Sequence, residues 1–294
     1  MLDAAPRIAD FGALMALYAA CLATGFGLKY ALRRSPRFAA KPIRSDARQE
    51  PSTAVFSQGP GIARKFKAFF LFQTALMTLA FWSIPGLAVL FLILFAFAVR
   101  EILRLRSGET YPAGYGFRPI PAYGLLVLSG LSLAGYLGFA AKITGAMPPP
   151  RGLPLLAFIF LLVAVADGYA QITGQILGGP KIVPRLSQGK TWSGFFGSLF
   201  FCALASWSGD HYFFGYIPEA GPAYATDVLA AVFGVFVASL AFLGDISASW
   251  VKRRMGLKDF SNLLGPQGGI LDRIDSLLWL GPALWLAAAV GLER

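Results

Sequence analysis

The sequence is poor in charged residues, in cysteine and in histidine. Only 14% of its 294 residues are charged, whereas an ordinary soluble domain has about 25%. Two cysteines and one histidine exclude a disulfide framework and a Cys-based metal site. They also leave no Ser/His/Asp or Cys/His set for nucleophilic catalysis. This composition excludes a soluble enzyme, a disordered chain and a fibrous protein.

Long apolar runs take the place of the missing charge, and 56% of the residues are hydrophobic. A helix needs about 20 apolar residues to cross the hydrocarbon core of a bilayer. We therefore predict an all-α, polytopic integral membrane protein with about eight transmembrane helices. The apolar runs lie at 9–28, 68–99, 120–141, 153–177, 194–207, 223–243 and 277–292.

The run at 68–99 is too long for one span, and it is interrupted at residues 83–86, which include Pro85 and Gly86. Basic residues flank it on both sides, so both of its ends are expected on the same side of the membrane. A helical hairpin accounts for both observations. Two full spans and a re-entrant hairpin are both open, because each arm is short.

Basic residues are concentrated in alternate loops. The loop 29–67 carries ten Lys or Arg residues and two acids, and the alternating set of loops that includes it holds 22 of the 26 basic residues. The positive-inside rule places this set in the cytoplasm and both termini outside. The net charge of +11 is therefore attributed to topology and not to nucleic-acid binding. We expect a multi-pass protein of the bacterial cytoplasmic (inner) membrane, in contact with membrane lipids.

The stretch 245–275 differs from the rest of the chain because it combines five basic residues with four acidic ones. If the preceding helix continues past residue 243, Asp245, Ser249 and Lys252 share one face of it. Asp272 and Asp275 are three positions apart, so they share a face at the start of the last helix. Three carboxylates that converge would suit Mg²⁺, which prefers oxygen ligands and keeps waters for a phosphate substrate. Ordinary ion pairing at the membrane surface is the alternative interpretation for any single residue.

Other residues would complete a phosphate-binding site at the cytoplasmic face. Nearby cations would offset phosphate charge, and glycines ahead of a helix would let backbone N–H groups approach an anion. Asp167 lies in or at the end of an apolar run, where an ionisable group is a functional candidate. These candidates are Asp167, Lys252, Arg253, Lys258, Gly268, Gly269 and Arg273.

This stretch resembles the signature of the phosphatidate cytidylyltransferase (CDP-diacylglycerol synthase) family. One position departs from the signature: Gln267 stands where the family usually has His. A Gln can donate and accept hydrogen bonds but does not titrate near pH 7, so we expect a bacterial paralogue. The matching residues are Ser249, Val251, Lys252, Arg253, Lys258, Asp259, Ser261, Leu264, Gly265, Gly268, Gly269, Ile270, Asp272, Arg273, Ile274 and Asp275.

Two weaker matches precede the signature. Residues 187–194 are similar to a second family element, of which Lys190 and Thr191 are kept and the Glu is replaced by Ser193. Asp167 and the glycines that follow it resemble the family's acidic helix and Gly-rich turn. By this resemblance 153–294 would be the catalytic half of a single membrane domain over 1–294. Residues 1–152 would supply the N-terminal helices and a basic cytoplasmic loop.

The resemblance implies an enzyme that uses Mg²⁺ to make CDP-diacylglycerol and pyrophosphate from CTP and phosphatidic acid. It implies Asp245, Asp272 and Asp275 as metal ligands and as catalytic residues together with Lys252. It also implies a homodimer, and it leaves open a second, monovalent cation. The implied substrate-binding residues are Asp167, Lys190, Ser249, Arg253, Lys258, Gln267, Gly268, Gly269 and Arg273.

Four other functions are weighed against this one. The acceptor could be another lipid or prenyl phosphate. A CTP-dependent polyprenol kinase would release CDP and not pyrophosphate. A lipid transporter is disfavoured because the polar cluster lies on one face and there is no inverted repeat. A non-catalytic paralogue is compatible with Gln267 and Ser193, but retention of the three carboxylates argues against it.

Overall fold

The computed structural model describes residues 4–34, 60–107, 111, 115–146, 152–187, 189–214, 223–264 and 268–291. Within these ranges the chain is helical and contains no strand, only an isolated bridge between Lys181 and Thr191. The predicted all-α class is confirmed. The long helices are α1 (Ala4–Arg34), α3 (Pro60–Trp82), α4 (Ile84–Arg106), α5 (Pro119–Ala146), α6 (Gly152–Leu177), α7 (Trp192–Gly209) and α8 (Ala223–Arg254). The shorter ones are η1 (Asp210–Phe214), α9 (Leu271–Ile274), η3 (Asp275–Leu277) and α10 (Leu280–Gly291).

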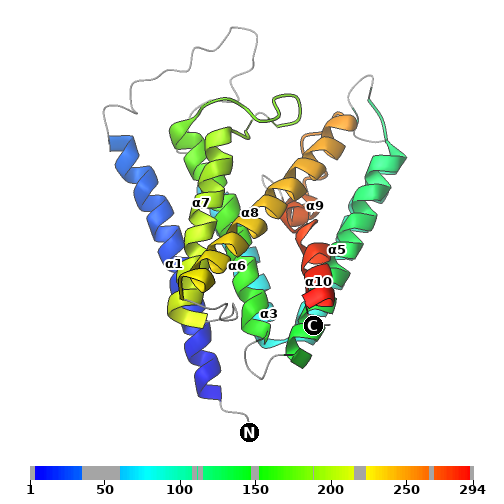
Figure 1. The fold of residues 1–294 in the computed structure, drawn as a ribbon. Coiled ribbons are helices and arrows are strands. Elements are labelled where there is room, and N and C mark those ends of the chain that lie inside the picture. The colour runs from blue at the N-terminus through cyan, green and yellow to red at the C-terminus, as the bar shows by residue number, and fades with distance from the viewer. Residues whose placement is uncertain are drawn as a thin grey trace.

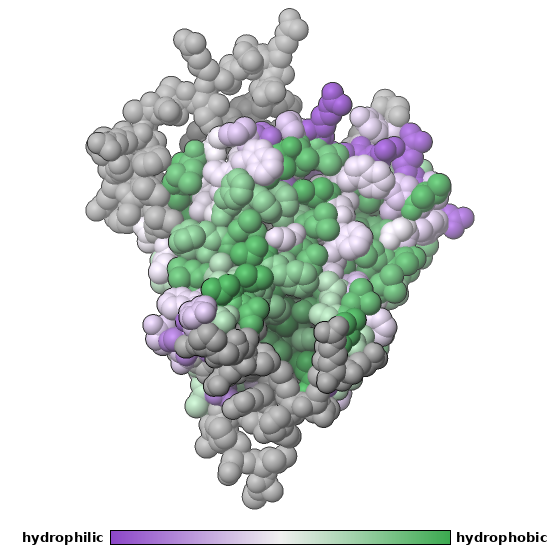
Figure 2. All heavy atoms as spheres, viewed as in Figure 1, coloured by the Kyte–Doolittle hydropathy of each residue, from purple (hydrophilic) through white to green (hydrophobic). Residues whose placement is uncertain are grey.

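Five helical segments of the described chain are long and apolar enough to cross a membrane. The apolar parts of α1 and α3 are shorter, at Ala9–Gly25 and Leu71–Trp82. A multi-pass membrane protein is thus supported, whereas the number of eight spans stays a prediction. Figure 2 shows apolar side chains over the middle of the molecule, with hydrophilic ones gathered chiefly at the upper end. These five segments are Ile84–Arg106, Pro119–Ile143, Pro154–Leu177, Tyr224–Arg254 and Leu271–Val290.

Helix α6 is the central element of the bundle (Figure 1) and packs against α1, α3, α7 and α8. Every residue from 154 to 166 is buried, which explains why this run is apolar on all sides and not on one face. Asp167 follows this buried run directly, so the core fixes its position. The loops that follow α6 and α8 lie at the same end of the bundle in Figure 1, and α1 begins and α10 ends towards the opposite end.

The predicted break in the run 68–99 lies at Ser83, between α3 and α4. Ser83 has an extended backbone, and its hydroxyl accepts a hydrogen bond from the Gly86 N–H at 2.9 Å. This is an N-cap, and Pro85 lies in the first turn of the new helix, where its missing N–H costs nothing. The break is confirmed, and the choice between two spans and a re-entrant hairpin stays open.

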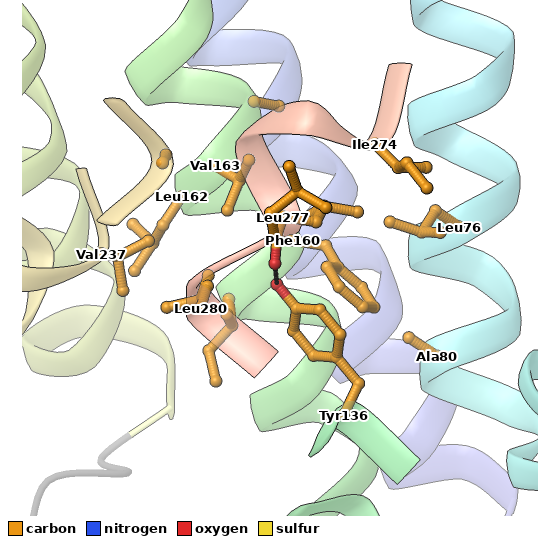
Figure 3. Packing of buried hydrophobic residues seen from close by; sticks show 14 of the residues in the cluster. Leu76, Ala80, Tyr136, Phe160, Leu162, Val163, Val237, Ile274, Leu277 and Leu280 are labelled. Atoms are coloured by element: carbon orange, nitrogen blue, oxygen red, sulfur yellow. Dashed lines mark hydrogen bonds between the residues drawn. The ribbon is translucent and has the colours of Figure 1, made fainter. Parts of the chain in front are cut away.

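The last apolar segment is interrupted between residues 274 and 280, and this interruption positions the acidic end of the segment. The break frees the carbonyl of Leu277, which accepts hydrogen bonds from Ser132 Oγ at 2.7 Å and from Tyr136 Oη at 3.3 Å. Figure 3 shows Tyr136 pointing at Leu277 within the apolar core. A freed carbonyl in this environment needs such partners, so α5 holds the short helices α9 and η3 in place.

Helix α10 approaches the backbone of α5 closely at Gly281. A Cβ on Gly281 would lie 2.1 Å from the carbonyl oxygen of Ser132 in α5. A Cβ on Gly124, elsewhere on α5, would meet nothing within 4 Å. We predict that Gly281→Ala lowers the free energy of unfolding by about 1–3 kcal/mol, as overpacking does. Thermal unfolding in detergent measures this, with Gly124→Ala as the control that leaves stability unchanged or slightly higher. Equal stability of both variants would contradict the packing.

The predicted division of the domain near residue 152 is not tested by the fold. Most of the basic loop 29–67 lies outside the described residues, and so do residues 265–267 of the signature. The cytoplasmic placement of these loops therefore stays a prediction.

Candidate active site

Asp272 is the most heavily bonded carboxylate of the signature. Its Oδ2 accepts the backbone N–H groups of Phe260 and Gly269, both at 2.9 Å, and its Oδ1 accepts Lys252 Nζ at 2.7 Å. Asp272 and Lys252 are only 7% and 8% exposed, so this is a buried, charge-assisted pair. Asp272 therefore closes the loop between α8 and α9 and fixes the Lys252 ammonium.

Gly268 explains why the signature needs glycine at this loop. Its φ is +80°, a backbone conformation that other residues adopt at a cost. A Cβ on Gly268 would also lie 2.7 Å from Asp272 Oδ2. The sequence predicted that these glycines let backbone N–H groups approach an anion. The anion that the Gly269 N–H meets in the structure is the carboxylate of Asp272.

Asp245 joins α8 to the loop that follows α6. Lys190 Nζ lies 3.0 Å from Asp245 Oδ2, and Ser249 Oγ donates to Asp245 Oδ1 at 3.4 Å. The predicted continuation of this helix past residue 243 is confirmed, since α8 runs to Arg254, and Asp245, Ser249 and Lys252 do share a face. Two stretches of sequence more than fifty positions apart thus meet at one ion pair.

The loop after α6 is braced by its own hydrogen bonds. Thr191 caps α7, its hydroxyl accepting the Gly194 N–H at 3.1 Å. Ser193 donates to the carbonyl of Gly178, where the chain turns through two glycines of positive φ, Gly178 and Gly179. The turn and the cap hold Lys190 against α8.

Asp275 and Asp167 lie next to each other at the inner end of the site. Ser276 Oγ donates to Asp167 Oδ2 at 2.8 Å, and the Ser276 N–H donates to Asp275 Oδ1 at 2.9 Å. Asp275 forms no ion pair with any described residue, although the charges of Asp245, Lys252 and Asp167 act on it. Carboxylates outnumber cations around it, an arrangement that a bound cation stabilises.

The remaining predicted residues differ in what they touch. Arg253 donates to two backbone carbonyls, those of Leu186 at 2.9 Å and Leu257 at 3.1 Å, so it ties the two loops together. Arg273 Nε is buried and has no protein partner. Lys258 is exposed, and Gln267 lies outside the described residues.

The described residues alone do not form the predicted metal site of three carboxylates. Among the described residues, no three His, Cys, Asp or Glu side chains are placed to hold a metal ion. Magnesium commonly uses one or two carboxylates and takes its other ligands from water and substrate phosphates. The assignment of three metal-binding carboxylates therefore stays a prediction.

Sequence reasoning missed Glu101, which lies on α4 and is 3% exposed. Its carboxylate accepts Ser261 Oγ at 2.6 Å and the N–H groups of Ile270 and Leu271 at 2.8 and 3.0 Å. The signal was present, since a lone acid follows Arg100 in an apolar helix. In the sequence, however, this acid stands within a basic flank of the apolar run, where a boundary charge is the ordinary interpretation.

Comparison with known proteins identifies the family of this chain. The cytidylyltransferase family model matches residues 61–290. A phosphatidate cytidylyltransferase of Pseudomonas aeruginosa is 33% identical over 224 residues, 72% of this chain and 75% of that one. The Brucella abortus protein of the same name is 31% identical over 196 residues, 67% of this chain but only 63% of its own length. That of Haemophilus influenzae is 36% identical over 129 residues, 44% of this chain and 43% of its own. Since the family model covers well over half of the sequence, the chain belongs to the cytidylyltransferase family.

Proposed function

We propose that the protein transfers the cytidylyl group of CTP to the phosphate of a membrane lipid, with phosphatidic acid as the acceptor. A phosphate oxygen of the lipid attacks the α-phosphorus of CTP. The bond from that phosphorus to the bridging oxygen breaks, and pyrophosphate leaves. The products are CDP-diacylglycerol and pyrophosphate, and no covalent protein intermediate is required.

The convergence of three separate motifs supports this proposal. Asp167, Lys190 and the stretch 245–276 are far apart in sequence, yet the Lys190–Asp245 pair and the Ser276–Asp167 hydrogen bond bring them together. The cluster combines carboxylates with cations, and direct displacement at a phosphorus atom needs no nucleophile from the protein. Catalysis of that kind depends mainly on positioning and charge neutralisation.

We propose that Mg²⁺ binds at this cluster together with the substrate. Asp245 and Asp275 would hold it, with water and phosphate oxygens as its other ligands. Asp272 would join them only through Oδ1, which it would share with Lys252 Nζ, because its Oδ2 already accepts two backbone N–H groups. When bound, the ion would neutralise phosphate charge and orient the triphosphate. A second, monovalent cation would be compatible with the same acidic surroundings.

The cationic side chains would act on the phosphates directly. Arg273 Nε is a buried donor without a protein partner, and a phosphate oxygen would satisfy it. Lys252 is held in one position by Asp272, and Lys190 by Asp245, so both charges are in place before substrate binds. Preorganised charges of this kind stabilise a transition state without further reorganisation.

We place the site at the cytoplasmic face of the bacterial inner membrane. The basic loops predict this side, and CTP is a cytosolic nucleotide. A site at the membrane surface would let the lipid keep its acyl chains in the hydrocarbon while its phosphate meets CTP. The proposed assembly is a homodimer, on the basis of the family resemblance alone.

An assay with purified protein in detergent tests the proposal. With Mg²⁺, CTP and phosphatidic acid we expect CDP-diacylglycerol and pyrophosphate in equal amounts, and neither product without Mg²⁺. If phosphatidic acid gives no product but a prenyl phosphate does, the reaction stands and the acceptor is wrong. If no lipid phosphate gives product and CTP does not bind, the proposal of an active enzyme is wrong.

A further inference from the structure

Glu101 is a buried carboxylate that lies outside the signature stretch and beyond the reach of any described basic side chain. It sits on α4, is 3% exposed, and forms no ion pair within the described residues. Its neighbours Arg100 and Arg104 are exposed. A carboxylate withdrawn from solvent in this way requires hydrogen bonds. The donors that bond Glu101 all belong to the loop between α8 and α9 or to the first residue of α9, within the signature.

That loop has two arms, residues 260–261 after α8 and residues 269–270 leading into α9. The hydrogen bonds of Glu101 and Asp272 alternate along both arms. Asp272 accepts the N–H groups of Phe260 and Gly269, while Glu101 accepts the hydroxyl of Ser261 and the N–H of Ile270. Consecutive residues on each arm are therefore bonded to different carboxylates. Glu101 also accepts the N–H of Leu271, the residue that precedes Asp272.

The backbone approaches Glu101 so closely that a side chain would not fit between them. A Cβ on Gly269 would lie 2.3 Å from Glu101 Oε1. The loop is thus clamped between α4 and Asp272, and the position of Asp272 sets that of Lys252 Nζ at 2.7 Å. The clamp reaches the proposed phosphate-binding groups through the backbone of residues 269–272 and the hydrogen bond of Asp272 to Lys252.

We propose that Glu101 is a positioning residue for the active site, which orders residues 260–261 and 269–271 so that Asp272, Arg273 and Lys252 face the substrate. It does not touch the substrate itself. The proposal gives α4 a role in positioning the active site, although α4 lies in the half of the chain that the signature does not reach. Its activity component rests on the proposed function, and its structural component does not.

Hydrogen–deuterium exchange of Glu101→Gln tests the structural component without any substrate. A Gln side chain places an N–H₂ group at one of the two acceptor positions. At Oε1 it would remove the acceptor of Ser261 and Ile270, and at Oε2 that of Leu271. We expect the backbone amide of Ile270 or of Leu271 to exchange at least about tenfold faster than in the unmodified protein. Arg104→Gln, an exposed residue one turn along α4, is the control and should leave exchange unchanged.

Steady-state kinetics test the activity component. A loop that is present but misplaced should lower kcat at least about tenfold, while KM for CTP changes by less than about threefold. A merely structural residue would lower the amount of folded protein and leave the kcat of that fraction intact. Unchanged exchange, or an unchanged kcat beside faster exchange, would overturn the proposal.

Ser261→Ala keeps the proposal testable if Glu101→Gln does not fold. This variant removes one of the three hydrogen bonds to Glu101 and leaves the buried carboxylate in place. It also removes the hydrogen bond from the Leu263 N–H to Ser261 Oγ, so the readout is Ile270 and Leu271, which do not bond Ser261. We expect faster exchange at these two amides and a smaller fall in kcat. Unchanged exchange there would count against the clamp. If the unmodified protein makes no CDP-lipid, the proposed function fails, and the exchange experiment still decides the role of Glu101.

Discussion

Asp275→Asn is expected to lower cytidylyl transfer at least about a hundredfold while leaving the protein at least as stable as before. Asp275 has no basic partner among the described residues, and the charges of Asp245 and Asp167 act on it. Neutralising it removes the repulsion from Asp245 and Asp167, and it loses only a through-space attraction to Lys252, which keeps its hydrogen-bonded partner Asp272. Activity falls because a metal ligand is removed, and metal stabilisation of transition-state charge is worth several kcal/mol.

The measurement combines turnover with thermal unfolding, with and without Mg²⁺ and CTP. We expect the melting temperature of Asp275→Asn without ligands to equal or exceed that of the unmodified protein, and the shift produced by Mg²⁺ and CTP to disappear. Asp227→Asn is a matched control, because Asp227 pairs with His211 near the start of α8, about 27 Å along the helix from Asp245. A normal ligand-induced shift in Asp275→Asn would contradict the assignment.

Asp272→Asn should also abolish activity, but with the opposite effect on stability. Asp272 is the hydrogen-bonded partner of the buried Lys252, and removing one member of a buried pair costs about 3–5 kcal/mol because the other charge loses its partner. An Asn also cannot accept at both oxygen positions, so either Lys252 or the loop N–H groups lose an acceptor. We expect a melting temperature lower by several degrees and turnover reduced at least about a hundredfold.

Replacement of an exposed carboxylate provides the comparison. Asp227→Asn breaks a partly exposed pair, and such pairs contribute at most about 1 kcal/mol, so its stability should barely change. Near-normal turnover of Asp272→Asn at saturating Mg²⁺ would refute the metal and positioning roles together. Unchanged stability would show that Lys252 does not depend on Asp272.

Most of the helical framework follows from the sequence because hydrocarbon imposes strict length and polarity limits. The apolar runs located the long helices, although α3 begins before its run, at Pro60, and α8 continues past its run to Arg254. The break at Ser83 was visible from Pro85 and Gly86. The break between residues 274 and 280 was not visible. It depends on Ser132 and Tyr136, which lie more than 140 positions away, so no local pattern announces it.

The candidate site was predictable where residues share a helix face and less so where they meet across loops. The shared face of Asp245 and Lys252 follows from helical spacing, whereas the individual partners Lys190 and Asp272 follow from tertiary packing. Glu101 shows the limit most clearly. A single acid in an apolar helix resembles a boundary charge in the sequence, and only the folded chain brings it against Ser261 and Ile270.

The central claim is that the nucleotide's α-phosphorus, and not its γ-phosphorus, becomes bonded to the lipid. The direct measurement uses purified protein, Mg²⁺ and phosphatidic acid with CTP radiolabelled at either phosphorus. We expect α-label in the lipid product and γ-label only in pyrophosphate, with both signals lost in Asp275→Asn. Transfer of γ-label to a lipid with release of CDP would contradict this account and identify a CTP-dependent kinase.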